Sequence, residues 1–274
     1  MIPNHIHFIF FGLTDFFYIH YLAIKTAALV HKPDKIFLHY YKAPQNNPLW
    51  DDILQYVELN YIVPPEEYKG IKLEWYQYKA DITRLEILIE QGGIYLDIDL
   101  LSMNDISRLL HHKCVLSVET AEDFYTTDLN KVHSITNAVL MCEPGHPMMI
   151  EWLEKTAENI AGKPWAYHAV TLPVDIAKNY TNGEIHIEPG KSFMPFDFRT
   201  DWVFYNNNEK YEWVKSSYGM HLWETIWYQP FLKQIDSRYL LEQDNIFTRL
   251  FRDYSLDNTN EEKNEKSLNY SLDN

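Results

Sequence analysis

Residues 79–102 have the sequence K-A-D-I-T-R-L-E-I-L-I-E-Q-G-G-I-Y-L-D-I-D-L-L-S, which indicates the fold class more clearly than any other part of the chain. Its first half predicts a helix over residues 80–91, because apolar side chains recur there at helical spacing. Gly92 and Gly93 end that helix, since glycine adopts the left-handed conformation of a helix cap. The residues that follow predict a buried strand over 94–101. A helix followed at once by a buried strand is typical of an α/β protein.

Two carboxylates stand out on this strand. Alternate strand residues share a face, so Asp97 and Asp99 point away from the core together with Tyr95. Side chains two residues apart lie about 7 Å from one another, and a pair of carboxylates is a good ligand set for a hard divalent cation. Such a cation stabilises a diphosphate leaving group. The alternative is that both aspartates simply end a strand at the solvent, which is the common case for an isolated D-x-D.

The preceding helix carries a second charged pair. Asp81 and Arg84 are three residues apart and therefore lie on one helical face. Their alternative roles are ordinary ones: Asp81 as a helix cap and Arg84 in a surface ion pair.

Outside this stretch the chain opens with a strand–helix–strand pattern, which begins a parallel sheet. A strand over residues 6–10 ends before Gly12, a helix capped by Thr14 or Asp15 runs to about Val30, and a second strand covers residues 35–41. Further helices are predicted over 51–57, 148–160 and 230–251. Residues 255–274 are polar and contain the repeated sequence Y-S-L-D-N, so we expect a disordered tail.

Charge and composition exclude several classes. A formal charge of −15 argues against nucleic acid as a partner and means that an anionic ligand needs local cations or a metal. Two cysteines, Cys114 and Cys142, form no disulfide framework and fit a reducing compartment. We find no run long enough to span a membrane and no secretory signal, and expect a cytoplasmic protein, peripheral at the inner membrane face if it contacts a membrane. The histidine pairs His5/His7 and His111/His112 lack a partner at metal-ligand spacing, so we expect surface or satisfied residues.

Residues 79–102 resemble the hallmark of the glycosyltransferases whose sugar-binding region contains a D-x-D motif, glycosyltransferase family 32. Three further stretches resemble family landmarks in the expected order. They are I-P-N-H-I-H-F-I-F-F-G at 2–12, S-I-T-N-A-V-L-M-C-E-P-G-H-P at 134–147, and H-L-W-E-T-I-W at 221–227. The resemblance therefore extends from residue 2 to about residue 228.

This resemblance implies a GT-A type fold, a Rossmann-like mixed sheet flanked by helices, in one domain over residues 1–254. The donor would bind at the carboxyl ends of the strands. It also implies a retaining transfer that depends on Mn²⁺ or Mg²⁺. The sugar would pass from a nucleoside diphosphate, UDP favoured, to a glycan or lipid-linked acceptor in polysaccharide biosynthesis.

The resemblance also assigns residues. Asp97 and Asp99 take the catalytic role and bind the metal, with His221 as a third metal ligand. The donor-binding residues are Phe10, Asp81, Arg84, Asp97, Asn137 and Trp227. For His221 the alternative is a core histidine packed beside Trp223.

Two positions depart from the family pattern. Phe10 stands where tryptophan is usual, so a base could stack on it but would find no indole N–H. Ile226 stands where a serine is common, and isoleucine has no hydroxyl to offer a phosphate or metal.

Two other classes of function remain open from the residues alone. A metal-dependent nucleotidyltransferase also uses paired aspartates, but it needs a basic or glycine-rich triphosphate loop, which we do not find in the sequence. A non-catalytic carbohydrate-binding protein would use the many aromatic residues, but it would not require Asp81, Arg84, Asp97 and Asp99 together.

Overall fold

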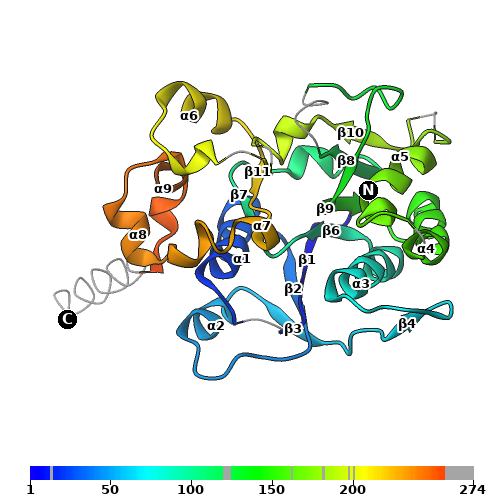
Figure 1. The fold of residues 1–274 in the computed structure, drawn as a ribbon, viewed down its shortest axis with the longest axis horizontal. Coiled ribbons are helices and arrows are strands. Elements are labelled where there is room, and N and C mark those ends of the chain that lie inside the picture. Colours follow the sequence, from blue (N-terminus) through cyan, green and yellow to red (C-terminus); the bar gives the residue numbers. More distant parts are fainter. Residues whose placement is uncertain are drawn as a thin grey trace, which may run out of the picture.

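The computed structural model describes residues 1–12, 15–119, 125–161, 163–180, 183–196, 198–199 and 201–256, apart from the side chain of Trp202. Within these residues the centre is a seven-stranded sheet in the order β10-β8-β9-β6-β1-β2-β3 (Figure 1). Its strands are β1 (His5–Phe10), β2 (Lys35–Tyr40), β3 (Glu58–Tyr61), β6 (Gly93–Leu96), β8 (Cys114–Val118), β9 (Ile135–Cys142) and β10 (His186–Glu188). Only β9 runs antiparallel to its neighbours in this sheet. The predicted mixed α/β fold is confirmed.

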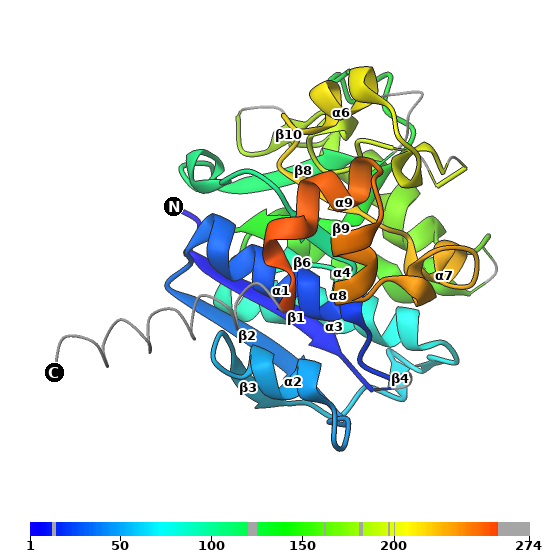
Figure 2. The same ribbon diagram turned by 90° about the vertical axis from the view of Figure 1, so that its left-hand side faces the viewer.

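Helices cover both faces of the sheet (Figures 1 and 2). One face carries α1 (Tyr18–His31), α2 (Pro48–Ile53), α8 (Ser237–Glu242) and α9 (Ile246–Phe251). The other carries α3 (Tyr76–Gln91), α4 (Pro147–Ile160) and α5 (Leu172–Ala177). The remaining elements are α6 (Asn208–Val214), α7 (Glu224–Trp227), a π-helical turn (Tyr167–Thr171), 3₁₀ turns, and the two-stranded pairs β4–β5 (Glu67–Tyr68, Ile71–Lys72) and β7–β11 (Leu100–Ser102, Gly219–His221).

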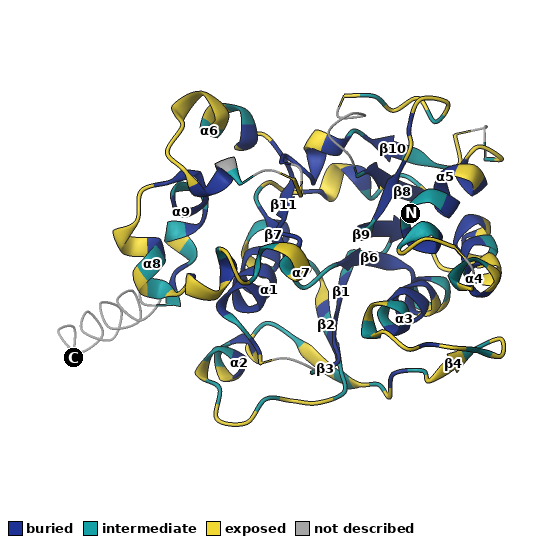
Figure 3. Ribbon diagram, viewed as in Figure 1, coloured by how far each residue is buried: buried dark blue, intermediate teal, exposed yellow. Residues whose placement is uncertain are grey.

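The alternation predicted for the strand after Gly93 holds over its first residues, but the prediction that Tyr95 points away from the core is wrong, because helices cover both faces of the sheet. Ile94 and Leu96 pack in the apolar cluster on the α1 side, whereas Tyr95 packs in the cluster on the α3 side. Both clusters are buried, and the central strands β6, β8 and β9 are dark blue, the colour of buried residues, in Figure 3.

The prediction of one continuous strand over residues 94–101 is wrong. The strand β6 stops at Leu96, and a turn follows in which the amide of Leu100 donates to the carbonyl of Asp97 at 2.9 Å. The chain then leaves the central sheet as β7, which pairs antiparallel with β11. Because β11 comes some 120 residues later, nothing local in the sequence reveals the break. Asp97 and Asp99 therefore lie on a turn that follows the carboxyl end of β6.

Capping side chains explain the other shifted boundaries. Asn47 accepts from the amides of Leu49 and Trp50, so α2 begins at Pro48 and not at residue 51. Asp236 and Asn245 cap two separate helices, α8 and α9, where one helical stretch over 230–251 was predicted. The helix α1 begins after Phe17, whose amide donates to the ring of His20, and not at Asp15. Thr14 lies outside the described residues.

Gly92 and Gly93 end α3 as predicted. Their φ angles are 65° and 98°, in the region that favours glycine. A Cβ on Gly93 would lie 2.7 Å from the carbonyl oxygen of His5 on β1, so this position also permits close approach between neighbouring strands.

The chain ends follow the prediction in part. Ser255 is buried, its carbonyl accepts from Lys25 at 3.1 Å, and Leu256 donates to Tyr18, so these two residues pack on α1 and are not part of a free tail. The rest of the predicted tail, residues 257–274, lies outside the described residues. Among described helices, none is long and apolar enough to cross a membrane. Cys114 and Cys142 are both buried and unpaired.

A series of hydrogen bonds between uncharged side chains links β3, β2 and β1 on the face of the sheet that α3 covers. Asn60 donates to Nδ1 of His39 at 2.9 Å, His39 donates to His7 at 3.0 Å, and His7 donates to the carbonyl of Gly92 at 3.1 Å. A carbonyl only accepts, so this direction fixes both tautomers. Burial lowers the pKa of His7 to about 4 and that of His39 to about 3.

We therefore expect acid to destabilise the fold. Unfolded histidine binds a proton below its ordinary pKa of 6.5, whereas folded His7 and His39 do so only near 4 and 3. The stabilisation is complete above pH 6.5 and is lost as the pH falls toward 4, at up to about 1.4 kcal/mol per pH unit for each group. Urea denaturation between pH 7 and 5 measures this slope. It should be smaller in His39→Gln than in wild type and unchanged in His111→Gln, an exposed position; equal slopes in all three would contradict the explanation.

Candidate active site

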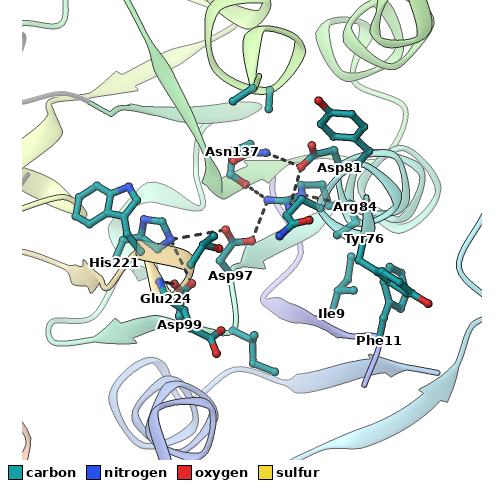
Figure 4. Close-up of a pocket in the computed structure, with 18 of the residues that line it drawn as sticks. Ile9, Phe11, Tyr76, Asp81, Arg84, Asp97, Asp99, Asn137, His221 and Glu224 are labelled. Carbon is teal, nitrogen blue, oxygen red and sulfur yellow. Dashed lines mark hydrogen bonds and ion pairs between the residues drawn. The ribbon is translucent and has the colours of Figure 1, made fainter. Parts of the chain in front are cut away.

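A cleft opens at the carboxyl ends of β1 and β6 (Figure 4). The end of β1 contributes Phe10 and the residues up to Gly12, and the turn after β6 contributes Asp97 and Asp99. The other polar walls come from α3, from β9, and from β11 with the segment that follows it. They contribute Asp81, Arg84, Asn137, His221 and Glu224. Since ligands of open α/β sheets bind at the carboxyl ends of parallel strands, this is the expected place for a donor.

The side chains of Asp97 and Asp99 lie next to that of His221 at the carboxyl end of β6. Nε2 of His221 lies 3.2 Å from Oδ1 of Asp99 and 3.8 Å from Oδ2 of Asp97. One ligand atom from each of the three residues lies within 4.8 Å of the others, and no other such group of three exists among the described residues. Two carboxylate oxygens and an imidazole nitrogen at this spacing fit Mn²⁺ or Mg²⁺. The predicted cluster is therefore assembled in space.

Backbone pairing holds His221 against the aspartates. It lies on β11, opposite Leu100 of β7, and the amide of Leu222 donates to the carbonyl of Asp99 at 3.1 Å. The amide of Glu224 donates to Oδ2 of Asp99 at 2.7 Å, so Asp99 also anchors the start of α7. His221 packs on the ring of Trp223 at 4.8 Å, which means that the alternative proposed for it, contact with Trp223, coexists with contact to the aspartates.

The charges within this cluster differ. Burial and the nearby charge of Asp99 raise the pKa of Asp97, although Arg84 and His221 oppose the shift. Burial also disfavours the ionised form of Asp99, but His221 and the amide of Glu224 outweigh it and lower the pKa of Asp99 to about 2. Burial disfavours the imidazolium of His221, yet the Asp99 carboxylate raises the pKa of His221 above its ordinary value. Asp99 is thus the firmly ionised member.

Arg84 joins the two charged pairs predicted from the sequence. Its guanidinium lies 3.0 Å from Asp81, donates to Oδ1 of Asp97 at 2.9 Å and donates to the carbonyl of Asn137 at 2.6 Å. Only 5% of the residue is exposed, so Arg84 is not in a surface ion pair. Asp81 lies inside α3 and not at its start, so it does not cap the helix. The amide of Asn137 donates to Oδ1 of Asp81 at 2.7 Å.

Of the two other predicted donor-binding residues, Phe10 lines the cleft and Trp227 does not. Phe10 lines the cleft from its buried position between Phe16 and Trp50. Trp227 lies on α7 with its ring against Phe231 at 5.5 Å, outside the lining of the cleft. Its indole N–H is buried and has no acceptor among the described residues. The exposed residues that line the cleft at this point are Thr225 and Ile226.

Sequence reasoning missed several contacts of the site. Nε2 of His168 lies 2.8 Å from Oδ2 of Asp81, and the hydroxyl of Tyr95 donates to Oδ1 of Asp97 at 2.6 Å. Tyr95 shares the strand face of Asp97, so its role could have been inferred from the alternation. His168 could not, because it belongs to a π-helical turn that no residue pattern announces.

Comparison with known proteins finds a matching family model and a similar fungal protein. Residues 23–116, which include the aspartates and Arg84, match the family model described as glycosyltransferase sugar-binding region containing DXD motif. The chain is 26% identical over 265 residues to glucan organizing enzyme 1 of Cryptococcus neoformans var. grubii serotype A, covering 93% of this chain and 71% of that protein.

Two solved structures show the same kind of similarity at lower identity. The PaToxG glycosyltransferase is 16% identical over 65% of this chain and 70% of its own, with a TM-score of 0.48. The galactosyltransferase LgtC, solved with donor and acceptor sugar analogues, is 16% identical over 68% and 74%, with a TM-score of 0.41.

The family match, taken with the cleft that its residues build, defines the chain as an enzyme of the glycosyltransferase class. More particularly, residues 23–116 match the family model of a sugar-binding region with a DXD motif, which confirms the predicted resemblance to glycosyltransferase family 32.

Proposed function

We propose that this glycosyltransferase is metal-dependent and retains the anomeric configuration of a nucleoside-diphosphate sugar donor, with UDP-sugars favoured. One observation carries the proposal. The cluster of Asp97, Asp99 and His221 shares a cleft with the Asp81–Arg84 pair at the carboxyl ends of β1 and β6. A site for a cation therefore adjoins a site with hydroxyl acceptors. Retention and the preference for UDP come from the family resemblance.

On the metal side, Asp99, Asp97 and His221 would hold Mn²⁺ or Mg²⁺. When bound, the ion supplies Lewis-acid stabilisation of the diphosphate leaving group. The protein's own contribution is to keep the three ligands in place. Asp99 is ionised and fixed by the amide of Glu224, and Asp97 is fixed by Arg84 and Tyr95. The chain is strongly acidic, which makes a cation necessary for binding an anionic donor.

On the sugar side, Asp81 would accept from hydroxyl groups of the transferred sugar. Each carboxylate oxygen has room for about two donors, and Asn137, Arg84 and His168 occupy only part of that capacity. Most of the N–H groups of the Arg84 guanidinium contact Asp81, Asp97 and Asn137. The main role of Arg84 would therefore be to orient both carboxylates. Asn137 would line the sugar pocket beside it.

On the nucleotide side, the base would stack near Phe10, at the end of β1. Trp227 would donate its unpartnered indole N–H to a phosphate once α7 turns toward the cleft. The acceptor would be a glycan or lipid-linked saccharide. The name of the fungal relative, a glucan organizing enzyme, agrees with a role in polysaccharide biosynthesis. Unpaired, buried Cys114 and Cys142 favour a reducing compartment such as the cytoplasm.

A donor-hydrolysis screen tests the proposal. UDP- and GDP-sugars are incubated with the protein and Mn²⁺, with EDTA as control, and the released nucleotide is measured. We expect release of nucleoside diphosphate from at least one donor, abolished by EDTA, and a product with the donor's α configuration by NMR. Release of pyrophosphate from a nucleoside triphosphate would identify a nucleotidyltransferase instead. Binding of free glycan without any effect of nucleotide or Mn²⁺ would identify a carbohydrate-binding protein.

A further inference from the structure

Two exposed tryptophans and a half-buried tyrosine form a surface at the cleft, which we call the aromatic platform: Trp75, Trp165 and Tyr78. The ring of Tyr78 stacks on that of Trp165 with centroids 5.0 Å apart, and Trp75 meets Trp165 edge-on at 5.9 Å. Trp75 is 55% exposed and Trp165 is 56% exposed. A contiguous exposed aromatic surface of this kind marks a binding site more often than a single exposed ring does.

The platform is assembled from two distant segments. Trp75 and Tyr78 stand three residues apart at the start of α3, which places them on one side of the helix. Trp165 comes from the segment between α4 and the π-helical turn, and the next residue, Ala166, has a φ of 62°. A left-handed alanine and a π-helical turn are both unfavourable locally, and such features cluster at functional sites. The fold thus accepts local strain where Trp165 is carried onto Tyr78.

The platform continues from the sugar side of the cleft. Tyr78 and Trp165 line the cleft, and Trp75 extends the surface outward from Trp165. The rings of Tyr78 and His168 pack at right angles with centroids 4.7 Å apart, and His168 contacts Asp81. The aspartate cluster and His221 lie on the other side of Arg84 (Figure 4). A ligand on the platform would therefore adjoin the sugar that Asp81 is proposed to hold, on the side away from the metal ligands.

We propose that the aromatic platform binds a pyranose ring of the acceptor saccharide, a proposal that rests on the proposed glycosyltransfer at this cleft. The C–H face of a pyranose is apolar and packs against aromatic rings, while its hydroxyl groups need polar partners. Exposed Gln77, which also lines the cleft, offers an amide with two donors and an acceptor at this position. An anionic lipid surface fits less well, because the chain carries a net charge of −15 and Glu74 is exposed beside Trp75.

Saturation-transfer NMR on the full chain tests the platform directly, with maltose, cellobiose, lactose and α-1,2-mannobiose as probes and no nucleotide sugar present. We expect at least one disaccharide to bind, with its C–H protons saturated by aromatic protons. Trp165→Ala should weaken that binding by about tenfold, Trp165→Phe should restore most of it, and Trp75→Ala should weaken it less. Tyr205→Ala, which removes a comparably exposed ring elsewhere, should change nothing. Thermal unfolding of each variant checks that it is folded.

Several outcomes would overturn the assignment. The first is that the wild type binds none of the disaccharides. The second is that folded Trp165→Ala and Trp75→Ala bind as the wild type does. The third is that Tyr205→Ala weakens saccharide binding as much as Trp165→Ala does. Binding of the wild type to phosphatidylcholine–phosphatidylglycerol vesicles, lost in both tryptophan variants while no saccharide binds, would show a membrane-contact surface instead. Because no donor is present, this test can fail while donor hydrolysis succeeds, and the reverse, so the two proposals are judged separately.

Discussion

Replacing Asp99 by asparagine should lower metal-dependent donor hydrolysis by about a thousandfold or more, with the fold intact. Stabilisation of a leaving group by a bound cation contributes several kcal/mol to the transition state, and each 1.4 kcal/mol corresponds to about tenfold in rate. Asp99 is the cluster residue that stays ionised, because its pKa is lowered to about 2. Asparagine keeps the shape but removes the charge that a hard cation requires.

The substitution separates chemistry from folding. Asparagine retains a side-chain oxygen, so the hydrogen bond from the amide of Glu224 can persist and the start of α7 remains anchored. Released nucleotide and thermal unfolding are measured together on the variant, on wild type and on Asp51→Asn, an exposed aspartate of α2. Near-normal hydrolysis by Asp99→Asn at saturating Mn²⁺ would refute the metal role of Asp99. A loss of activity accompanied by unfolding would assign Asp99 a structural role only.

Replacing Arg84 by methionine should destabilise the protein by about 3–5 kcal/mol, because it leaves two buried carboxylates without their cation. Arg84 lies 3.0 Å from Asp81 and 2.9 Å from Asp97, and the three side chains are largely shielded from water. Methionine has a similar length, so the cavity contribution is small. Urea denaturation at neutral pH gives the free energy of unfolding.

A second substitution makes this test specific. Adding Asp81→Asn to Arg84→Met removes one of the stranded charges, so the double variant should recover part of the lost stability. Arg238→Met breaks a surface ion pair with Glu242 and should change the free energy of unfolding little. Equal free energies of unfolding for Arg84→Met and Arg238→Met would show that the ion-pair network of Arg84 does not stabilise the fold.

Much of this architecture could be predicted from residues 79–102. Helical periodicity, the two glycines and the alternation after them predict most of α3, its end and the residues of β6. The helix begins at Tyr76, four residues before the predicted start, and β6 ends at Leu96. The spacing of Asp81 and Arg84 places them on one face of α3, where the structure finds them paired. These features depend on residues that are close together in the sequence, so the sequence of residues 79–102 is enough to predict them.

Local caps account for the shifted starts of α1 and α2, whereas the failures at the site involve partners distant in sequence. The break at Asp97 depends on β11, which draws β7 away from the central sheet. The contact of His168 with Asp81 and the placement of Trp165 on Tyr78 depend on an irregular segment with a π-helical turn. His221 was placed beside the aspartates only by family resemblance. Periodicity and spacing contain no information about such contacts, which tertiary packing alone creates.

Titration of Mn²⁺ into the protein in the presence of UDP shows whether Asp97, Asp99 and His221 together bind a divalent cation. Electron paramagnetic resonance measures free Mn²⁺ and therefore gives stoichiometry and affinity without any assay of transfer. The proposal predicts one strong site in the wild type, no strong site in Asp99→Asn, and a site about tenfold or more weaker in His221→Ala. Equal Mn²⁺ affinity in all three folded proteins would contradict it.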